Sequence, residues 1–219
     1  MIITWRGQSF FELAIKNQEH KEVKVVIDPY DESLGLKVPK VEAQILLVSH
    51  SHSDHSNLSA IIGEPFLIKT PGEYEIQGVF VKGIPAFHNN NLGKEKEMVT
   101  IYKIEAEEMK ICHLSDLGQK ELTEQQLEEI GAVDILMIPV GGIYTIGAKE
   151  ASSIISQIEP KLVVPMHYQI PKLKVKLEGV EKFLKVMGVG SIEPEAQLKI
   201  KLIDLPKEEE TKIVILKAR

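Results

Sequence analysis

The sequence predicts an α+β fold in which two mixed β-sheets pack together and helices flank their outer faces. Short segments rich in β-branched residues follow one another through the first half of the chain. The second half alternates buried strand-like runs with amphipathic helical segments. A front half of strands followed by strand–helix alternation is typical of such a layered arrangement.

Length and composition predict a single domain over residues 1–219. The chain has 219 residues, 43% of them hydrophobic, which is enough for one sizeable core. Its net charge of −6 gives no general attraction for nucleic acid or for an anionic membrane. The single Cys112 excludes an internal disulfide and favours a cytoplasmic location. We also expect no signal peptide and no membrane span, because no suitable apolar run is present.

The front half is predicted to consist of strands separated by polar or glycine-containing turns. One short helix is expected among them, over residues 56–63, ending at Gly63. The predicted strands cover residues 2–5, 10–15, 22–27, 43–48, 66–69, 73–76, 79–84, 98–104 and 110–112.

In the back half, helical and strand-like patterns take turns. Gly131 follows the first predicted helix and Pro160 stops the second. The predicted helices cover residues 123–130, 148–158 and 179–187, and the predicted strands cover residues 133–138, 161–164, 198–203 and 212–216.

Three histidines and one aspartate lie close together in the segment Ser49–His55, in an H-x-H-x-D-H pattern after a buried-strand run. In an extended segment alternate side chains point the same way, so His50 and His52 can reach one metal ion. Asp54 and His55 can then serve a second ion. These ligand types suit zinc, manganese, iron or nickel, and the absence of thiolates argues against a closed structural zinc site. The competing interpretation is a solvated, histidine-rich loop.

Three further candidate ligands lie where predicted strands end: His88, Asp116 and His167. Sites in open sheets tend to form at the carboxyl ends of strands. Each residue alone is more often a structural polar group. Together with the histidine-rich segment, they indicate a set of metal ligands at strand ends.

The complete pattern resembles the metallo-β-lactamase superfamily, in which H-x-H-x-D-H is followed by a lone His, an Asp in a turn and a last His. The resemblance implies a four-layer αββα sandwich with two divalent metal ions, zinc first among the metals. It implies that His50, His52 and His88 hold one ion, that Asp54, His55 and His167 hold the other, and that Asp116 bridges both.

Several residues beside these ligands have proposed supporting roles. Asp28 matches an early Asp that orients the metal loop in the family, although a helix or turn cap is the alternative. His113 either supports the site or contacts substrate, or is a buried, hydrogen-bonded histidine under Asp116. Tyr144, Thr145 and Tyr168 lie in loops next to ligands, where they could position substrate or serve only in packing and capping.

Two segments narrow the resemblance to the UlaG-like group, whose named member is an ascorbate-6-phosphate lactonase. Residues 138–147 contain P-x-G-x-x-x-T-x-G, and residues 165–168 read P-M-H-Y. Departures occur at Gln8 and Gln119, where the group has His, and at Leu117, where Thr is frequent. Ser115 also replaces the usual Gly of the bridging turn. These positions lie outside the predicted ligand set, so they bear on substrate and turnover rather than on metal binding.

The resemblance implies a hydrolase in which water bridging the two ions attacks as hydroxide, with Asp54 or Asp116 taking part in proton transfer. The expected substrate is a small anionic lactone, phosphodiester or related ester, and the chain could form a homo-oligomer. A nuclease or nucleotide phosphodiesterase and a non-catalytic metal-binding protein remain alternatives. A di-iron redox protein is a weaker one, because such relatives carry Glu at the position of His52 and need an electron-carrying partner domain.

Overall fold

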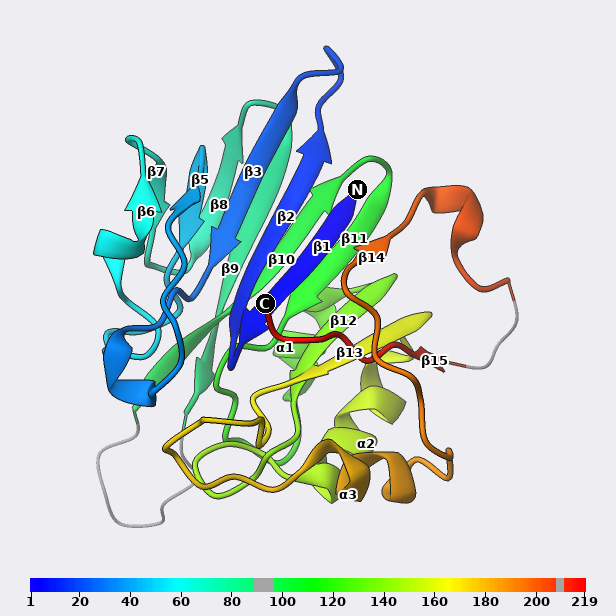
Figure 1. Cartoon of the computed structure of the whole chain (residues 1–219). Helices are drawn as coiled ribbons and strands as arrows, with labels where there is room; N and C mark the ends of the chain where they lie inside the picture. Colours follow the sequence, from blue (N-terminus) through cyan, green and yellow to red (C-terminus); the bar gives the residue numbers. More distant parts are fainter. Residues whose placement is uncertain (89–96, 208–210) are drawn as a thin grey trace.

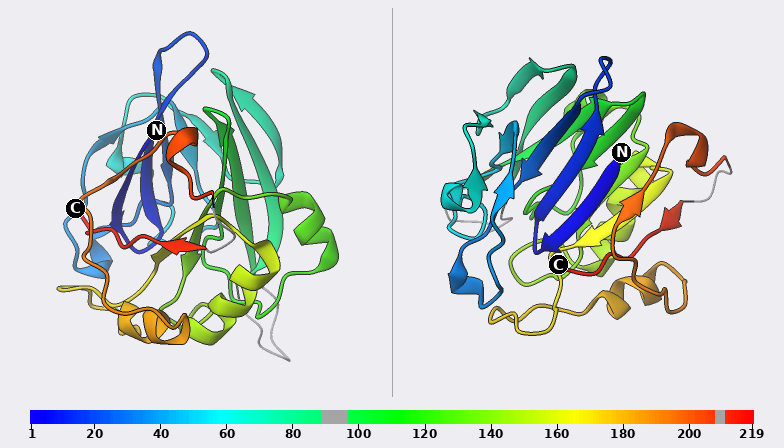
Figure 2. Two further views of the ribbon diagram at one scale, coloured as in Figure 1. Left: turned by 90° about the vertical axis from the view of Figure 1, so that its right-hand side faces the viewer. Right: turned by 45° about the horizontal axis from the view of Figure 1, so that its top comes forward.

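The computed structural model describes residues 1–88, 97–207 and 211–219. Two large sheets pack face to face and enclose most of the core (Figures 1 and 2). In the first sheet, β1, β2 and β3 are antiparallel neighbours, whereas β5 runs parallel to both β3 and β7. In spatial order its strands are Leu198–Lys199 (β14), Ile2–Gly7 (β1), Phe10–Lys16 (β2), Glu22–Ile27 (β3), Ile45–Leu47 (β5) and Phe66–Ile68 (β7).

The second sheet is also mixed. Its antiparallel half comes from the hairpins of the middle of the chain, and its parallel half comes from the strand–helix alternation of the back half. Its strands, in spatial order, are Lys212–Ile213 (β15), Leu162–Met166 (β13), Ile135–Pro139 (β12), Met109–His113 (β11), Met98–Ala106 (β10), Val79–Phe87 (β9) and Gly72–Ile76 (β8).

Three α-helices lie against the second sheet in the described part of the chain, and the predicted fold class is confirmed (Figure 2). A capping box at Thr123 starts the first of them. The outer face of the first sheet is covered by loops and by a 3₁₀ turn at Glu32–Leu34 (η1), whose Leu34 packs there. The helices are Glu124–Ile130 (α1), Ala148–Ile158 (α2) and Val180–Val186 (α3).

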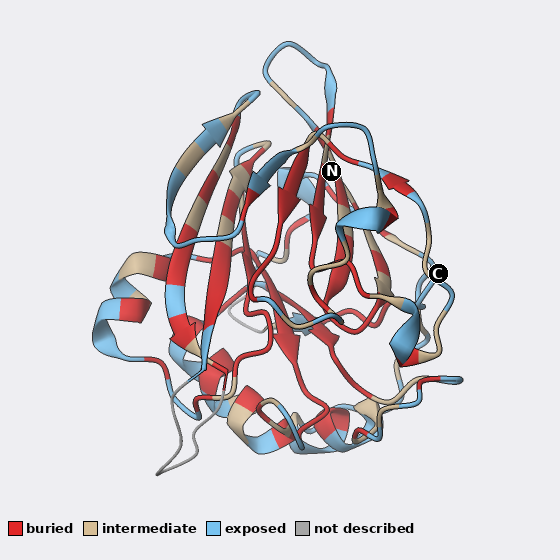
Figure 3. Cartoon of the chain, turned by 90° about the vertical axis from the view of Figure 1, so that its left-hand side faces the viewer, coloured by how far each residue is buried: buried red, intermediate tan, exposed pale blue. Residues whose placement is uncertain are grey.

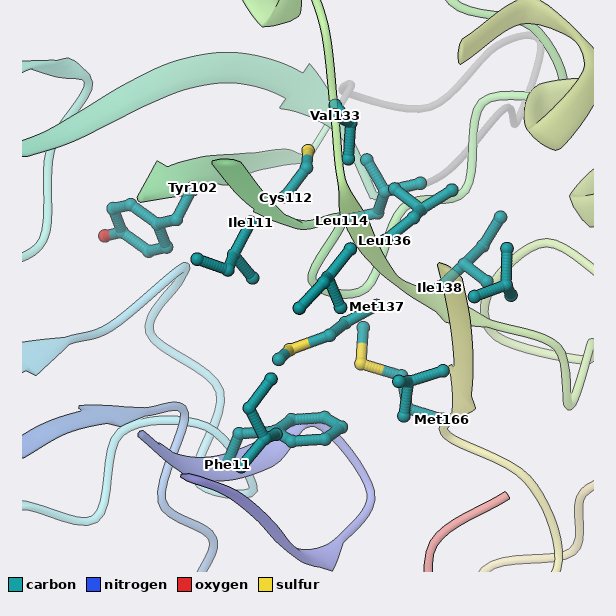
Figure 4. Packing of buried hydrophobic residues seen from close by; sticks show 14 of the residues in the cluster. Phe11, Tyr102, Ile111, Cys112, Leu114, Val133, Leu136, Met137, Ile138 and Met166 are labelled. Carbon is teal, nitrogen blue, oxygen red and sulfur yellow. The ribbon is translucent and has the colours of Figure 1, made fainter. Parts of the chain in front are cut away.

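Successive side chains of a strand point to opposite faces of its sheet, so the first sheet contributes to two hydrophobic clusters. One lies between the two sheets and the other lies on the outer face of the first sheet. Phe11 points between the sheets, whereas its neighbour Phe10 packs on the outer face of the first sheet. Figure 4 shows Phe11 facing Met137 of β12 and Met166 of β13 across the interface. Buried residues accordingly dominate the strand centres, while the helices bury one side (Figure 3).

Two predicted elements are wrong, and the strand expected over residues 212–216 ends at Ile213. Residues 56–63 form a 3₁₀ turn, Leu58–Ala60 (η2), and a short strand, Ile61–Ile62 (β6), rather than a helix. The two β-branched isoleucines pair instead with Val41–Glu42 (β4) in a small parallel sheet. Likewise, the strand expected over residues 198–203 stops at Lys199, and Leu202–Asp204 (η3) is a 3₁₀ turn.

The fold gathers strand ends from both sheets at one place. In the first sheet, β3 leads into Asp28 and β5 leads into the histidine-rich segment. In the second, β9, β11 and β13 lead into the other predicted ligands. No helix within the described ranges is long and apolar enough to cross a membrane.

Candidate metal centre

The histidine-rich segment Ser49–His55 is a turn rather than a strand end. The buried strand β5 stops at Leu47, and the N–H of His55 bonds to the carbonyl of His52 at 3.0 Å. Strand alternation is therefore the wrong reason for expecting His50 and His52 to converge. They converge nevertheless, because the turn places Nε2 of His50 3.0 Å from Nδ1 of His52.

A first cluster consists of His50, His52 and His88. One ring nitrogen from each lies within 4.8 Å of those of the other two. The His88 ring centroid is 5.0 Å from that of His50 and 5.2 Å from that of His52. His88 is held at the end of β9 by its N–H, which bonds to the carbonyl of Glu97 at 2.8 Å. This is the predicted grouping for one ion.

The second predicted grouping, Asp54, His55 and His167, also lies within 4.8 Å by its ligand atoms. Oδ2 of Asp116 is 3.0 Å from Nε2 of His55 and 3.2 Å from Nε2 of His167. Asp116 also groups with His50 and His55, so its carboxylate lies between the two clusters. The structure thus brings all seven predicted ligands together, in the arrangement that the resemblance implies.

Asp28 supports the histidine-rich segment from below. Its Oδ1 accepts the backbone N–H of Ser49 at 2.7 Å, and its Oδ2 accepts the Ser49 hydroxyl at 2.7 Å. The same Oδ2 lies 3.1 Å from Nδ1 of His55. Burial alone would raise the pKa of Asp28, but the hydrogen bond and positive charge of His55 lower it on balance. Asp28 therefore holds two parts of the motif as an anion.

Asp116 is supported by Ser9, whose hydroxyl donates to Oδ1 at 2.8 Å. His113 lies behind this contact, fully buried, with Nε2 3.0 Å from the carbonyl of Ser9. Its Nδ1 accepts the N–H of Ser115. Both ring nitrogens are thus used within the protein, which matches the interpretation of His113 as a buried, hydrogen-bonded histidine under Asp116. Burial is the main cause of its lowered pKa.

The charges of the site are strongly coupled. Burial, and next the charge of His55, lowers the pKa of His50 to about 3, so His50 is neutral and can donate a lone pair. Burial would lower the pKa of His55, but Asp116 and Asp28 raise it well above its usual value. Burial would raise the pKa of Asp116, but His167 and His55 keep it well below its usual range. The metal-free centre therefore holds an ionised Asp116 against a protonated His55.

The hydrogen bonds identify which ring nitrogens carry lone pairs. The Ser49 hydroxyl donates to Asp28, so its oxygen accepts the Nδ1–H of His50 at 2.9 Å, which leaves a lone pair on Nε2. Oε1 of Glu97 lies 2.6 Å from Nε2 of His52. A carboxylate accepts hydrogen bonds, so Nε2 carries the hydrogen and Nδ1 has the lone pair. These two lone pairs face each other across 3.0 Å. Such an arrangement is repulsive without a cation, so the residues present fit a metal ion.

Further buried nitrogens agree with this conclusion. Within the described residues, Nδ1 of His88 and Nδ1 of His167 have no hydrogen-bond partner, whereas Nε2 of His55 lies 3.0 Å from the Asp116 carboxylate. Buried polar groups are normally satisfied, so rings with an unpaired nitrogen in both clusters agree with side chains arranged to bind an ion. The donor set of histidine and aspartate suits a transition metal.

The predicted substrate-side residues occupy different places. Tyr144 is 58% exposed, whereas Thr145 is half-buried with its hydroxyl on the carbonyl of Ile146. Tyr168 is buried against Trp5, with ring centroids 4.9 Å apart. It lines a cavity of about 550 Å³ that none of the seven predicted ligands lines. Tyr144 and Thr145 thus stay candidates for substrate contact, whereas Tyr168 has a packing role in this structure.

The four residues that depart from the UlaG-like pattern, Ser115 among them, are all buried. Gln119 accepts the N–H of Phe87 at 3.1 Å and so fixes the end of β9 just before His88. Leu117 is a core residue whose carbonyl accepts the N–H of Ile146. Gln8 has neither amide atom paired within the described ranges, although its carbonyl accepts the N–H of His167 at 3.2 Å.

Sequence reasoning missed three supporting residues, Ser9, Ser49 and Glu97. Ser49 lies inside the histidine-rich segment, directly before His50. Its position there is a local signal from which a supporting hydroxyl could have been predicted. Ser9 and Glu97 gave no local signal, because their partners Asp116 and His52 are distant in sequence.

Comparisons with known proteins place this geometry among relatives. A β-lactamase superfamily domain model matches residues 2–167. A UPF0173 metal-dependent hydrolase of Methanopyrus kandleri is 26% identical, over 86% of this chain and 94% of its own. Another, from Thermococcus onnurineus, is 28% identical, over 75% and 85%. A crystal structure of a proposed Zn-dependent hydrolase of the metallo-β-lactamase superfamily from Thermotoga maritima is 36% identical, covers 99% of both chains and has a TM-score of 0.77.

Proposed function

The chain belongs to the metallo-β-lactamase superfamily, and from this membership we propose that it is a dinuclear metal-dependent hydrolase of a small anionic lactone, phosphodiester or related ester. The facing lone pairs of His50 and His52 carry the proposal, because a cation between them removes their repulsion. Relatives named metal-dependent hydrolases support hydrolysis as the reaction class. Residues 138–147 and 165–168 support a UlaG-like subgroup.

The proposal assigns a set of protein ligands to each ion. Divalent ions at such a centre would acidify water toward a pKa of about 7 and polarise a carbonyl or phosphoryl oxygen. Zinc fits the donor set, as do manganese, iron and nickel. His50, His52 and His88 would hold one ion, Asp54, His55 and His167 would hold the other, and Asp116 would contact both.

The two carboxylates of the centre differ in access. Asp116 has a side chain only 4% exposed, and Ser9, His55 and His167 engage its two oxygens. The Asp54 side chain is 28% exposed, and its Oδ2 lies 3.7 Å from Nε2 of His55. Asp54 is therefore the carboxylate placed to take a proton on the substrate side, whereas Asp116 orders the two clusters.

The segment 141–147 is the candidate substrate-contacting rim. At one end Gly141 packs against His167, and at the other the N–H of Ile146 bonds to the carbonyl of Leu117 at 2.9 Å. Between these anchors, Ile143 is 67% and Tyr144 is 58% exposed. We infer that Tyr144 and Thr145 contact the substrate from this rim. A small anion suits the centre because the ions supply local positive charge to a chain of net charge −6.

Metal content and turnover test the proposal together. Protein purified without chelator is expected to carry about two transition-metal ions per chain by elemental analysis. The loaded protein is then assayed with lactones and with phosphodiesters. Asp54→Asn is expected to lower kcat by about 10²–10⁴ if Asp54 moves a proton. Asp204→Asn, at an exposed aspartate of η3 whose carboxylate accepts the N–H of Lys201, serves as the control.

Different outcomes separate the competing functions. Metal content near zero, without uptake of added zinc, manganese or iron, would overturn the proposed centre. Bound ions without turnover of either ester class would favour a non-catalytic metal-binding protein. Salt-sensitive cleavage of RNA would favour the nucleic-acid phosphodiesterase instead.

A further inference from the structure

We propose that Glu97 is a positioning residue that fixes the tautomer of His52 and so completes the three-histidine ion site. The inference rests on the proposed metal centre and adds to it a residue outside the predicted ligand set. Glu97 lies directly before β10, whereas His52 belongs to the turn after β5 in the other sheet. A contact between them therefore joins the two sheets at the edge of the site.

The side chain of Glu97 contacts the ring nitrogen of His52 that faces away from the cluster. Its Oε1 lies 2.6 Å from Nε2, while Nδ1 faces Nε2 of His50 at 3.0 Å. An ionised carboxylate only accepts hydrogen bonds, so Nε2 must carry the hydrogen. The Nδ1 lone pair is then directed toward His50 and His88. Without Glu97 the ring is free to adopt the other tautomer, in which Nδ1–H points into the site.

The backbone of Glu97 holds a second ligand. Its carbonyl accepts the N–H of His88 at 2.8 Å, one step beyond the pairing of Met98 with Phe87 in the β9–β10 ladder. One residue thus fixes the ring of His52 through its side chain and the position of His88 through its main chain. Glu97 connects two of the three histidines of the cluster.

Two other predicted ligands, His50 and His55, also have a partner at the ring nitrogen that faces away from the ions. Asp28 accepts from Nδ1 of His55, and Ser49 accepts from Nδ1 of His50. Such partners typically change metal affinity by about 10–100-fold when removed. The side chains of Glu97 and His52 are each 42% exposed, so solvent screens their interaction more than that of the buried Asp28. We therefore expect the lower part of this range.

The test compares three proteins by titration with Co²⁺ or Zn²⁺ against a competing chelator: wild type, Glu97→Ala and Glu97→Gln. Glu97→Ala is expected to weaken one of the two ions by about 10-fold and to leave the other unchanged. Glu97→Gln is expected to lose less, because its amide oxygen still accepts from Nε2–H. Glu105→Gln is the matched control: Glu105 lies on β10, the strand that follows Glu97, and pairs with Lys103 away from the cluster.

Two further readouts make the result specific. The absorption spectrum of the Co²⁺ protein should change at one ion only in Glu97→Ala, and partial recovery in Glu97→Gln would identify the hydrogen bond as the cause. The role of Glu97 would be overturned if Glu97→Ala bound each ion as tightly as wild type does. It would also be overturned if the variant bound both ions more weakly by the same factor. A wild-type protein that takes up no metal would instead overturn the proposed function.

Discussion

Asp28 and His55 form a fully buried pair, with Oδ2 of Asp28 3.1 Å from Nδ1 of His55 and neither side chain exposed. This contact leaves Nε2 of His55 free to face Asp116 and the second cluster. Asp28 adopts a positive φ of 47°, a conformation that aspartate tolerates better than most residues. The less favourable backbone conformation of Asp28 thus occurs where its carboxylate contacts both His55 and Ser49.

Asp28→Asn is expected to lower metal affinity by about 10–100-fold. The amide keeps the shape of the side chain but cannot accept from Ser49 and His55 as an anion does. The metal-free protein should also lose about 1–3 kcal/mol, because a buried hydrogen-bonding group is left unsatisfied. Chelator competition and urea unfolding measure the two effects, with Asp204→Asn as control, at an exposed aspartate of η3. Unchanged affinity would show that Asp28 does not orient His55.

His113 should make the metal-free protein sensitive to acid. Because burial lowers its pKa in the folded state, the unfolded chain binds more protons as the pH falls below about 6.5. The stabilising contribution of neutral His113 is therefore complete above that pH and is lost as the pH falls through the lowered pKa.

The measurement is urea unfolding between neutral and mildly acidic pH in the presence of chelator. His113→Asn should reduce the slope of stability against pH by up to about 1.4 kcal/mol per pH unit, the value for one proton. His20→Asn, at an exposed turn, should leave the slope unchanged. Equal slopes in wild type and His113→Asn would contradict the prediction.

The sequence allowed the clustering of the seven candidate ligands to be predicted because its signal is local. The histidine-rich segment, His88, Asp116 and His167 each end or follow a strand-like run, and strand ends meet at one edge of the fold. The exact extent of α2 was predictable for a similar reason: its amphipathic pattern is followed by Pro160. Each of these features can be recognised from residues that are adjacent in the sequence.

What could not be predicted depends on distant contacts. Ser9 and Asp116 are 107 positions apart, and neither stands in a pattern that indicates the other. The helix expected over residues 56–63 failed because Ile61 pairs with Val41, a tertiary contact that overrides the local pattern. The convergence of His50 and His52 depends on a turn, which alternation of strand residues does not describe.

Gln8→Met is expected to stabilise the metal-free fold by about 1 kcal/mol. The Gln8 side chain is fully buried, and its amide atoms lack partners in the described part of the chain, so burying them costs free energy that an apolar side chain avoids. Gln119→Met is the matched control, since Gln119 is also buried but bonds to Phe87 and Glu121. It should destabilise the fold.

Urea unfolding measures the change in unfolding free energy of Gln8→Met and Gln119→Met relative to wild type. Stabilisation by Gln8→Met with destabilisation by Gln119→Met would attribute the difference to hydrogen bonding rather than to side-chain size. A loss of stability in Gln8→Met similar to that in Gln119→Met would show that the Gln8 amide has a favourable partner in solution.

Gly141→Ala should damage the fold and the second cluster together. A Cβ at Gly141 would lie 2.1 Å from the carbonyl oxygen of His167 and 3.0 Å from Cα of Tyr168. These are backbone atoms, so rotation of a side chain cannot relieve the clash, and the main chain of His167 must move. We expect a loss of at least about 2 kcal/mol in unfolding free energy. Binding of the ion assigned to His167 should weaken more than binding of the ion at the three histidines.

Gly190→Ala is the control for this substitution, because a Cβ there meets nothing within 4 Å. It should change stability by less than about 0.5 kcal/mol. Urea unfolding gives the stability, and Co²⁺ titration separates the two ions. If Gly141→Ala bound both ions as wild type does, the position of the His167 backbone would not limit the second site. If it weakened both ions equally, the damage would be general, and the selective link between Gly141 and His167 would be wrong.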